Sequence, residues 1–413
     1  MPLGNAKTLK KVFDLLCPFE KDGTLKSEEN RKALLASNAN IPLDVEMKGF
    51  VMASCTGGGS PQLVQISYNT AKDTGNDLKK IKAPEGVKRN PLAIRPAAIG
   101  AKRCADMLNW LTDDFDAQLV FMTLDHFSSP KFDFNACRDC QGSGGVNRYE
   151  AKARIEEAIE VMKPIFGKEV EINQETIDAY VNYMAGDGLG AFRKDFIGAV
   201  MLGNPAWAMI DTGMLPPVLN FAISKEIVER VRKDLDNKDV LIEAEFSATG
   251  FSGGEEGYQK LTGAALENFK NRVVLFVKYI GGDGVAYEIG MEHAAKKGEV
   301  HEPDIQRLEV VQRALFLEGG RYIPFAQHGG TGAAHLAKGL VGKNNINTRY
   351  LVNEANFFAD HYEANKEGVR AGLKNACGAG IYHNMALSVA QSCIEKMKET
   401  GTYGMTPELL KAL

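Results

Sequence analysis

The sequence lacks the features that mark several large classes of protein. Its 49 Lys and Arg residues nearly balance its 53 Asp and Glu residues, for a formal net charge of -4. It therefore has no basic footprint for nucleic acid and no polybasic patch for a membrane surface. No uninterrupted apolar stretch approaches the length of a membrane span, and the first residues lack the apolar core of a secretion signal. We expect a cytoplasmic protein with no nucleic acid and no membrane among its partners.

Cysteine is scarce as well. The seven Cys residues are odd in number and mostly isolated, which indicates reduced thiols rather than a disulfide framework. Cys137 and Cys140 have the C-x-x-C spacing of redox pairs and zinc knuckles, but a knuckle needs a second pair and the sequence has none. We interpret them as two loop thiols with no assigned function.

The sequence does contain a repeated alternation of short apolar runs and amphipathic stretches. Near-continuous apolar runs are typical of parallel strands that are covered on both faces. This many alternations, with polar residues at the strand ends, predicts an α/β fold of the (β/α)8 TIM barrel type, and an open doubly wound sheet is the alternative. The expected strands span residues 49–54, 118–124, 208–211, 240–246, 285–290, 322–327 and 344–347. The expected helices between them span residues 101–110, 225–233, 264–270, 305–317 and 333–340.

Two helical segments are expected outside this alternation, within a single barrel domain over residues 1–413. Residues 127–205, after the strand that carries His126, contain no good barrel strand, and we interpret them as a helical insertion with helices at 148–163 and 174–184. Residues 353–413 form a helical C-terminal segment with breaks at Gly378 and Gly380.

Four segments place a metal-ligand type at the end of a probable strand: His126, Glu245, His293 and His328. The carboxyl ends of all strands meet at one mouth of a barrel, so these side chains converge there. A lone His is more often packed or on the surface, but three at strand ends favour a metal site. Neutral imidazoles suit zinc, and three protein ligands with open positions mark a catalytic metal. We predict Zn²⁺, with another divalent metal as the alternative.

Further acidic residues accompany these ligands. Asp125 precedes His126 directly, so both can face the site only if the strand bends at its end. Glu243 and Glu245 point the same way, and two buried carboxylates are costly unless a cation or donors compensate. The Gly-rich loop at residues 247–257 ends with two acids, including Glu256. Such a loop can deliver a mobile acid or base, and a solvated surface loop is the alternative.

A Gly-rich turn, Gly329-Gly330-Thr331-Gly332, follows His328 and opens a probable helix. Backbone N–H groups and the helix dipole make such a turn a seat for phosphate. The residues after His293 add the cations Lys296 and Lys297 in a second loop beside a ligand His.

Taken in order, these motifs resemble the class II fructose-bisphosphate aldolases, which are zinc-dependent (β/α)8 enzymes and usually dimers. The resemblance spans roughly residues 95–127 and 205–375. The segments that carry it are Leu124-Asp125-His126, Glu243-Ala244-Glu245, Gly253-Gly254-Glu255-Glu256, Gly290-Met291-Glu292-His293, His328-Gly329-Gly330-Thr331-Gly332 and Asn345-Ile346-Asn347-Thr348.

The resemblance implies a role for each matching residue. His126, His293 and His328 would bind zinc, with Glu245 as an alternate or supporting ligand. Asp125 would hold or protonate the aldehyde-side hydroxyl, and Glu256 would move the proton of the triose carbon. The implied contacts to the sugar phosphate are Ser54, Ala294, Lys297, Gly329, Gly330, Thr331, Asn345, Asn347 and Thr348. A monovalent cation is a further ion to expect.

The resemblance also implies an assembly. Arg370 lies in a segment similar to one whose Arg reaches the site of a neighbouring subunit and binds the far phosphate. We therefore expect a homodimer or a larger homo-oligomer, and an exposed helix Arg is the alternative reading of Arg370.

The expected reaction is reversible cleavage of a ketose bisphosphate to dihydroxyacetone phosphate and an aldehyde, as in glycolysis and gluconeogenesis. Fructose 1,6-bisphosphate and glyceraldehyde 3-phosphate are the default pair. Where the family reads Asn-Ile-Asp-Thr-Asp, this chain has Asn347 and Arg349 in place of the two acids, and Ala294 replaces a Gly. Tagatose bisphosphate, or a ketose with a different terminal anion, is therefore an alternative substrate. A non-catalytic sugar-phosphate-binding paralogue is a second alternative, and a barrel hydrolase is disfavoured because the chain has no His-x-His pair.

Overall fold

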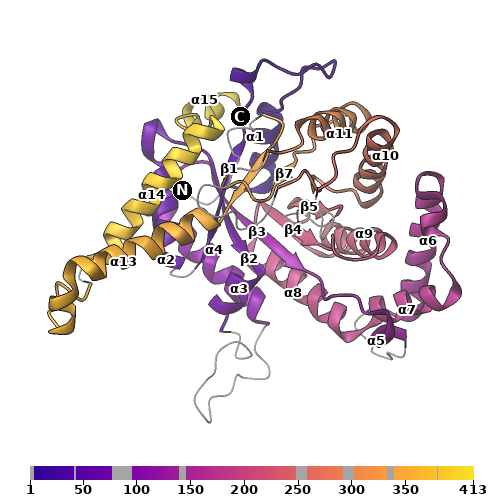
Figure 1. Ribbon diagram of the computed structural model, residues 1–413, viewed down its shortest axis with the longest axis horizontal. Helices are drawn as coiled ribbons and strands as arrows, with labels where there is room; N and C mark the ends of the chain where they lie inside the picture. Colours follow the sequence, from indigo (N-terminus) through magenta and orange to yellow (C-terminus); the bar gives the residue numbers. More distant parts are fainter. Residues whose placement is uncertain are drawn as a thin grey trace, which may run out of the picture.

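The computed structural model describes residues 4–40, 43–76, 95–138, 146–247, 258–291, 302–332, 339–378 and 380–413. Within these ranges, eight parallel strands form one sheet in the order β6-β5-β4-β3-β2-β1-β8-β7. A parallel bridge between Val285 and Phe325 joins its two edges. The sheet is thus a nearly closed barrel with helices around it (Figure 1), and the predicted TIM-barrel fold is confirmed.

The strands and helices follow each other along the chain as the alternation predicts. The strands are β1 Leu34–Ala39, β2 Gln62–Ser67, β3 Val120–Ser128, β4 Trp207–Asp211, β5 Leu241–Glu245, β6 Gly284–Ala286, β7 Ala326–Gln327 and β8 Lys343–Ile346. The helices are α1 Ala6–Leu15, α2 Leu43–Ser54, α3 Tyr68–Thr74, α4 Pro96–Asp114, α5 Phe134–Arg138, α6 Arg148–Phe166, α7 Gln174–Ala185, α8 Asp187–Gly203, α9 Pro217–Asp234, α10 Gly263–Ile280, α11 Ile305–Gly319, α13 Thr348–Arg370, α14 Ile381–Thr400 and α15 Thr406–Ala412.

The barrel interior changes character along the strands. At the amino ends, side chains such as Phe121 and Trp207 belong to one buried apolar cluster. Two and four residues further along β3 come Thr123 and Asp125, and Glu243 lies on β5, all of them buried. Because alternate residues of a strand share a face, the same inward face becomes polar toward the carboxyl ends. This places the polar groups at the mouth where a barrel carries its site.

One predicted strand is wrong. Residues 49–54 belong to helix α2, which is buried on most of its circumference. A Cβ at Gly49 would lie 2.7 Å from the backbone oxygen of Ala386, so α2 packs closely against α14 there. The apolar run that looked like a strand is therefore the buried surface of a helix held between neighbours. Strands β1 and β2, which lie on either side of this helix in sequence, were not predicted.

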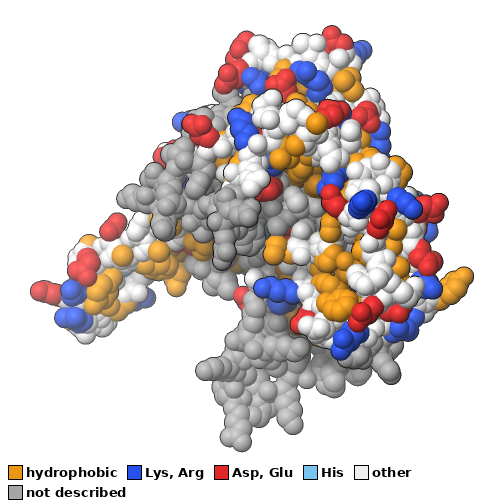
Figure 2. Space-filling model, turned by 45° about the vertical axis from the view of Figure 1, so that its right-hand side comes forward, with side chains coloured by type: hydrophobic (Ala, Val, Ile, Leu, Met, Phe, Trp, Pro, Cys, Tyr) orange, Lys and Arg blue, Asp and Glu red, His pale blue; other side chains and the backbone are white. Residues whose placement is uncertain are grey.

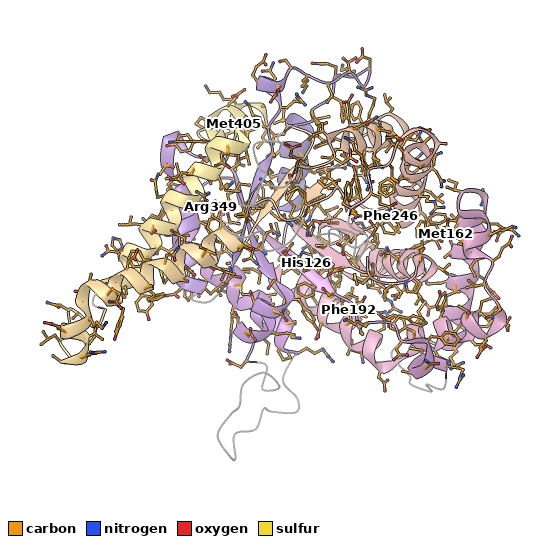
Figure 3. The ribbon with its side chains drawn as sticks, in the orientation of Figure 1. His126, Met162, Phe192, Phe246, Arg349 and Met405 are labelled. Atoms are coloured by element: carbon orange, nitrogen blue, oxygen red, sulfur yellow. The ribbon has the colours of Figure 1, made fainter. Side chains whose placement is uncertain are left out.

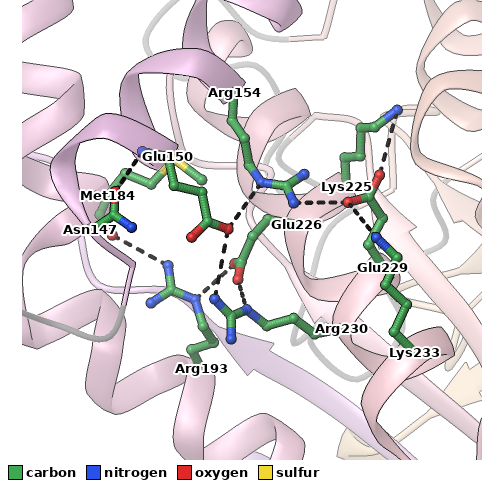
Figure 4. Close-up of polar contacts among 10 residues, drawn as sticks. All are labelled: Asn147, Glu150, Arg154, Met184, Arg193, Lys225, Glu226, Glu229, Arg230 and Lys233. Carbon is green, nitrogen blue, oxygen red and sulfur yellow. Dashed lines mark hydrogen bonds and ion pairs between the residues drawn. The ribbon is translucent and has the colours of Figure 1, made fainter.

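The segment between β3 and β4 is helical. Its helices α5 to α8 extend to one side of the barrel (Figure 1), and α8 is an additional helix that the sequence pattern did not indicate. A network of ion pairs fixes this segment to α9 (Figure 4). In its centre, Arg193 Nε donates to Glu226 Oε2 at 2.8 Å, with both side chains buried. Nearby, Arg154 Nη2 lies 2.8 Å from Glu229 Oε2.

The C-terminal segment is also helical, and α13 leads away from the barrel. It runs outward and forms a projecting arm, here defined as residues 348–387, in which the start of α14 returns beside α13 (Figure 1). The rings of Phe358 and Tyr382 lie edge to face across this arm. Among the described helices, none is both long enough and apolar enough to cross a membrane.

Candidate active site at the carboxyl ends of the strands

The end of β3 is distorted, and the distortion changes the directions of Asp125 and His126. The pairing of β3 with β4 shifts register between Leu124 and Phe127, and His126 has a φ of 43°. In a regular strand, Asp125 and His126 would point to opposite faces. The bulge, with a non-glycine residue in the left-handed region, lets both contact groups of the barrel mouth at a cost in backbone strain. This is the bend that the sequence required.

Two predicted ligands, His126 and His328, meet at the mouth, and His126 is labelled at the end of β3 in Figure 3. His126 Nε2 lies 2.8 Å from His328 Nδ1, and the rings are nearly perpendicular with centroids 4.5 Å apart. A carboxylate lies at the outer nitrogen of each ring: Asp211 Oδ2 is 3.2 Å from His126 Nδ1, and Glu243 Oε1 is 3.4 Å from His328 Nε2.

This arrangement decides where the ring protons lie. An ionised carboxylate only accepts hydrogen bonds, so each outer nitrogen carries the hydrogen. Neutral His126 and His328 then direct their lone pairs at each other. Two lone pairs at this distance repel unless a proton or a cation lies between them. The pair is therefore built to share a positive charge.

A divalent metal fits this donor set. Two nitrogens on a tetrahedral zinc at about 2.0–2.1 Å would be about 3.3 Å apart, so His126 and His328 need only a small separation to admit one. Across the described part of the chain, no group of three or more His, Cys, Asp or Glu side chains is arranged to hold a metal. The third expected ligand, His293, lies outside the described residues.

The electrostatics of the pair reflect the carboxylates around it. Burial opposes a charge on His126, but Asp125, Asp211 and Glu245 raise its pKa to about 10. Burial, together with the charge on His126, lowers the pKa of His328. In the absence of a metal, the shared proton thus belongs to His126.

Glu245 and Asp211 lie side by side at the ends of β5 and β4. Burial favours the neutral form of Asp211, but hydrogen bonds from His126 and Glu245 lower its pKa below the usual range. A Cβ at position 213 would lie 2.8 Å from Glu245 Oε2, so Gly213 leaves room for this carboxyl. Sequence reasoning missed Asp211, although it is the last residue of a predicted strand and so carries the same signal as His126.

Asp125 is held by amides on either side. Asn38 Nδ2 on β1 donates to its Oδ2 at 2.9 Å, and Asn345 Nδ2 on β8 donates to its Oδ1 at 3.4 Å. Burial would raise the pKa of Asp125, but His126, Lys343 and His328 lower it, so this side chain stays a carboxylate. Asn38 is a second residue that sequence reasoning missed.

The same two amides leave acceptors unused. Asn38 is 6% exposed and Asn345 8% exposed, yet the Oδ1 atom of each has no hydrogen-bond partner within the described residues. Buried polar atoms are normally paired. Two unpaired acceptors on the residues that hold Asp125 indicate a place for a ligand that donates hydrogen bonds, such as one with hydroxyl groups.

Below the histidines lies a buried ion pair. Lys343 Nζ lies 2.8 Å from Glu243 Oε2, and Trp207 Nε1 donates to the same oxygen at 2.6 Å. Burial raises the pKa of Glu243, but Lys343 and His328 outweigh it and lower the pKa to about 2. Sequence reasoning expected a cation or hydrogen-bond donors beside a buried Glu243, but it did not identify Lys343.

The expected phosphate seat begins directly after His328. Gly329 has a φ of 67°, and the N–H of Gly330 donates to the backbone oxygen of Asn345. That N–H is therefore occupied within the protein. Lys396, from α14, donates to the backbone oxygen of Thr331 at 3.0 Å and brings a cation to this turn that the sequence did not point to. The residues after Gly332, where a helix was expected, lie outside the described range until Gly339.

Asn347 and Arg349, which depart from the aldolase pattern, both contact other side chains of the protein. Asn347 Oδ1 accepts from Asn40 Nδ2 at 2.9 Å, and Thr348 begins α13. Arg349 Nε donates to Ser392 Oγ at 2.8 Å, and its guanidinium also pairs with Glu395. The additional cation thus contacts α14 and is not directed at the barrel mouth.

The structure does not bring Ser54 to the other predicted residues. Ser54 ends α2 and donates to Gln62 Oε1 at 2.7 Å and to the Phe50 backbone oxygen. Gln62 is the first residue of β2, so Ser54 lies at the amino end of the barrel, about 17 Å from the mouth by strand rise. At the mouth itself, Ser67 ends β2 in register with Asp125.

Arg370 is exposed at the far end of α13. It is 22 residues beyond Thr348, which corresponds to about 33 Å of helix. It therefore lies far from the mouth of its own barrel. The predicted residues Glu256, Ala294 and Lys297, and Cys140 of the C-x-x-C pair, lie outside the described ranges.

Comparisons with known proteins agree with this geometry. The family model "Fructose-bisphosphate aldolase class-II" matches residues 206–405, from β4 through α14. No curated protein matches the chain. Among solved structures, a fructose-bisphosphate aldolase from Campylobacter jejuni is similar with a TM-score of 0.54, 16% identity and coverage of 98% of this chain and 97% of that chain. The YdjI aldolase from Escherichia coli K12 is similar with a TM-score of 0.50, 12% identity and coverage of 98% and 99%. These two likenesses support the fold.

Proposed function

Because the chain is a divergent member of the class II fructose-bisphosphate aldolase family, we propose that it is a zinc-dependent aldolase for a phosphorylated ketose. It would cleave a ketose bisphosphate reversibly to dihydroxyacetone phosphate and an aldehyde, with fructose 1,6-bisphosphate as the default substrate. The observation that carries the proposal is the contact at 2.8 Å between His126 Nε2 and His328 Nδ1. Their opposed lone pairs need a proton or a cation between them, and zinc would take that place.

The proposed zinc site consists of His126, His328 and His293, with Glu245 as a supporting or alternate ligand. Bound there, Zn²⁺ would polarise the ketone and stabilise the negative charge that develops as the carbon–carbon bond breaks. Asp211 and Glu243 would hold the two described histidines by their outer nitrogens, in the way that carboxylates commonly orient ligand histidines.

Asp125 is the proposed acid and base for the aldehyde half. In the cleavage direction its carboxylate accepts the hydroxyl proton as that hydroxyl becomes the aldehyde, and in condensation it returns the proton. Asn38 and Asn345 keep the carboxylate in place, and their unpaired Oδ1 atoms would accept from hydroxyls of the sugar. Glu256 would protonate the triose carbon once the bond has broken.

The phosphates would be held at two places. One is the turn Gly329–Thr331, supported by Lys396 and the cations of the Lys297 loop. The other is Arg370, which lies too far from its own barrel to act there and would reach the site of a second copy. An arm with exposed apolar side chains gives that copy a surface to pack on (Figure 2). These side chains are Leu351, Val352, Phe358, Tyr362, Leu373, Tyr382 and Leu387. We therefore propose a homodimer.

A panel assay tests this proposal. Release of triose phosphate is measured from fructose 1,6-bisphosphate, tagatose 1,6-bisphosphate and ketose 1-phosphates with other terminal groups, with and without a chelator. Cleavage of at least one of these ketoses, lost on chelation and restored by zinc, is the expected result. Undiminished turnover by protein shown to contain no metal would contradict it. Tight binding of sugar phosphates without any turnover would indicate a non-catalytic paralogue, and release of inorganic phosphate would indicate a hydrolase.

The panel also addresses the altered substrate contacts. Asn347 presents an amide where the family has an acid, and Arg349 is paired with α14. The position therefore offers hydrogen bonds without charge. The order of kcat/KM among the ketoses reports which hydroxyl arrangement this amide favours.

A further inference from the structure

Lys343 is an unusual residue for the inside of a barrel. Its side chain is fully buried on β8, and it lies below the mouth rather than in it. Burying an ammonium group is costly unless ionised partners surround it. Its partners are Glu243 at 2.8 Å and Asp125 Oδ1 at 3.8 Å.

The contacts of Glu243 divide between its two oxygens. Its Oε2 accepts from Lys343 Nζ at 2.8 Å and from Trp207 Nε1 at 2.6 Å. Its Oε1 lies 3.4 Å from His328 Nε2. Two donors thus anchor one oxygen, and this fixes the plane of the carboxylate so that the other oxygen faces the imidazole.

That orientation determines which nitrogen of His328 is available to a metal. With Glu243 as an ionised acceptor, the hydrogen of His328 lies on Nε2 and the lone pair on Nδ1, toward His126. If Glu243 were rotated away, Nε2 would lose this acceptor. The hydrogen could then lie on Nδ1 and block the face that the metal needs.

We propose that Lys343 is a positioning residue for the metal site. By anchoring Glu243, it keeps the Nδ1 lone pair of His328 directed at the metal, and by its second contact it keeps the charge of Asp125 balanced. This inference rests on the proposed zinc site, but not on which ketose is cleaved.

The test compares three variants with a matched control. Lys343→Met removes the ammonium and keeps the length of the side chain. Glu243→Gln keeps the shape of the acceptor and removes its charge, and the double variant removes both buried charges together. The control is Arg193→Met, which breaks another buried ion pair, that of Arg193 with Glu226 at 2.8 Å between α8 and α9. That pair is not part of the site.

Two measurements on the full chain report on the metal directly. The zinc-loaded protein is titrated with a competing chelator to give the affinity for zinc, and the cobalt-loaded protein gives an absorption spectrum that depends on ligand geometry. Substituting a residue that orients a metal ligand typically weakens metal binding by about 10- to 100-fold. We expect that loss, with a changed cobalt spectrum, for Lys343→Met, for Glu243→Gln and for the double variant, and no change for Arg193→Met.

The outcomes separate the inference from the proposed function. Folded Lys343→Met with the wild-type zinc affinity and cobalt spectrum would overturn the inference, as would an equal loss of affinity in Arg193→Met. If Lys343→Met does not fold, Glu243→Gln decides the matter in the same two measurements. Wild-type protein that binds zinc but cleaves no ketose phosphate overturns the proposed function alone. Wild-type protein that binds no zinc overturns both.

Discussion

His126 and His328 face each other through ring nitrogens 2.8 Å apart, and each has a carboxylate at its outer nitrogen. Asp211 and Glu243 thereby fix the direction of both lone pairs. In the proposed zinc site, such preorganisation would lower the cost of binding, because the two ligands would not have to be ordered when the ion enters. The mouth of the barrel is thus shaped around a positive charge by residues from β3, β4, β5 and the end of β7.

Removal of either imidazole should remove the metal. His126→Ala and His328→Ala each delete one nitrogen donor of the site, so we expect both variants to lose bound zinc and triose phosphate release together. Elemental analysis of the purified variants, with the coupled assay on the same samples, measures this. A variant that keeps one zinc per chain and the wild-type rate would show that the imidazole pair is not the metal site.

Asp125→Asn should lower the rate of the reaction and leave metal binding unchanged. The amide keeps the size of the side chain but cannot accept a hydroxyl proton, and general acid–base steps typically contribute about 10²- to 10⁴-fold to the rate. The expected result is a loss of kcat in that range with zinc content unchanged. The rates are compared at saturating ketose. A loss smaller than tenfold would remove Asp125 from the proton transfer.

Much of the site could be predicted from the sequence, and the strands explain why. His126, Glu245 and His328 each end or follow an apolar run, which predicts both a strand and its carboxyl end. Asn38 and Ser67 were missed because β1 and β2 carry polar residues on their inward faces. Those residues interrupt the apolar pattern.

Other features could not be predicted from the local sequence. A Lys at the start of a strand usually lies at the surface, and only barrel closure brings Lys343 to Glu243 across 100 residues of sequence. The apolar run at residues 49–54 was predicted as a strand, because a helix packed between neighbours is also apolar on most sides. Burial alone cannot distinguish it from a covered strand.

A buried pair of acids should make stability depend on pH. Glu46 on α2 and Glu354 on α13 share a hydrogen bond, and burial raises the pKa of Glu46 to about 7 and that of Glu354 to about 8. Asn40 joins this pair to Asn347, since its Nδ2 contacts both Glu46 Oε1 and Asn347 Oδ1. The pair therefore supports a residue of the proposed substrate site.

The sign follows from proton linkage. Both folded pKa values lie above the unfolded value of 4.5, so the folded state binds more protons between about pH 4.5 and 8. The stabilisation is complete below this window and is lost as the pH rises through it, at about 1.4 kcal/mol per pH unit for each proton. The Glu354→Gln variant has only one acid of the pair left to ionise. Its free energy of unfolding should therefore fall less than that of the wild type between pH 5.5 and pH 8.5. Urea unfolding at several pH values measures this difference, and parallel curves would contradict it.

Arg370 should act across a dimer. Because it lies about 33 Å along α13 from its own barrel mouth, Arg370→Ala should raise KM for a bisphosphate with little effect on a ketose lacking the far phosphate. A mixture provides the control. When Arg370→Ala subunits are refolded with Asp125→Asn subunits, a hybrid dimer contains one site with both residues intact, and activity on the bisphosphate should return. Absence of recovery in hybrids shown to form would place Arg370 outside the site.

The ion-pair network of the helices inserted between β3 and β4 should contribute to stability very unevenly. Glu226 is fully buried and pairs with Arg193, which is only 4% exposed. Glu226→Gln leaves that buried guanidinium without its anion, and breaking a buried pair typically costs about 3–5 kcal/mol. Glu229, in the same network, is partly exposed and pairs with Arg154 at 2.8 Å, so Glu229→Gln should cost less than about 1 kcal/mol.

Urea unfolding of the two variants measures this contrast. Zinc affinity should stay at the wild-type value in both, because neither carboxylate touches the barrel mouth. Equal losses of stability would mean that burial does not determine how much each ion pair stabilises the protein. A loss of zinc affinity in Glu226→Gln would mean instead that the inserted helices determine the geometry of the site through α9, which connects β4, with Asp211, to β5, with Glu243.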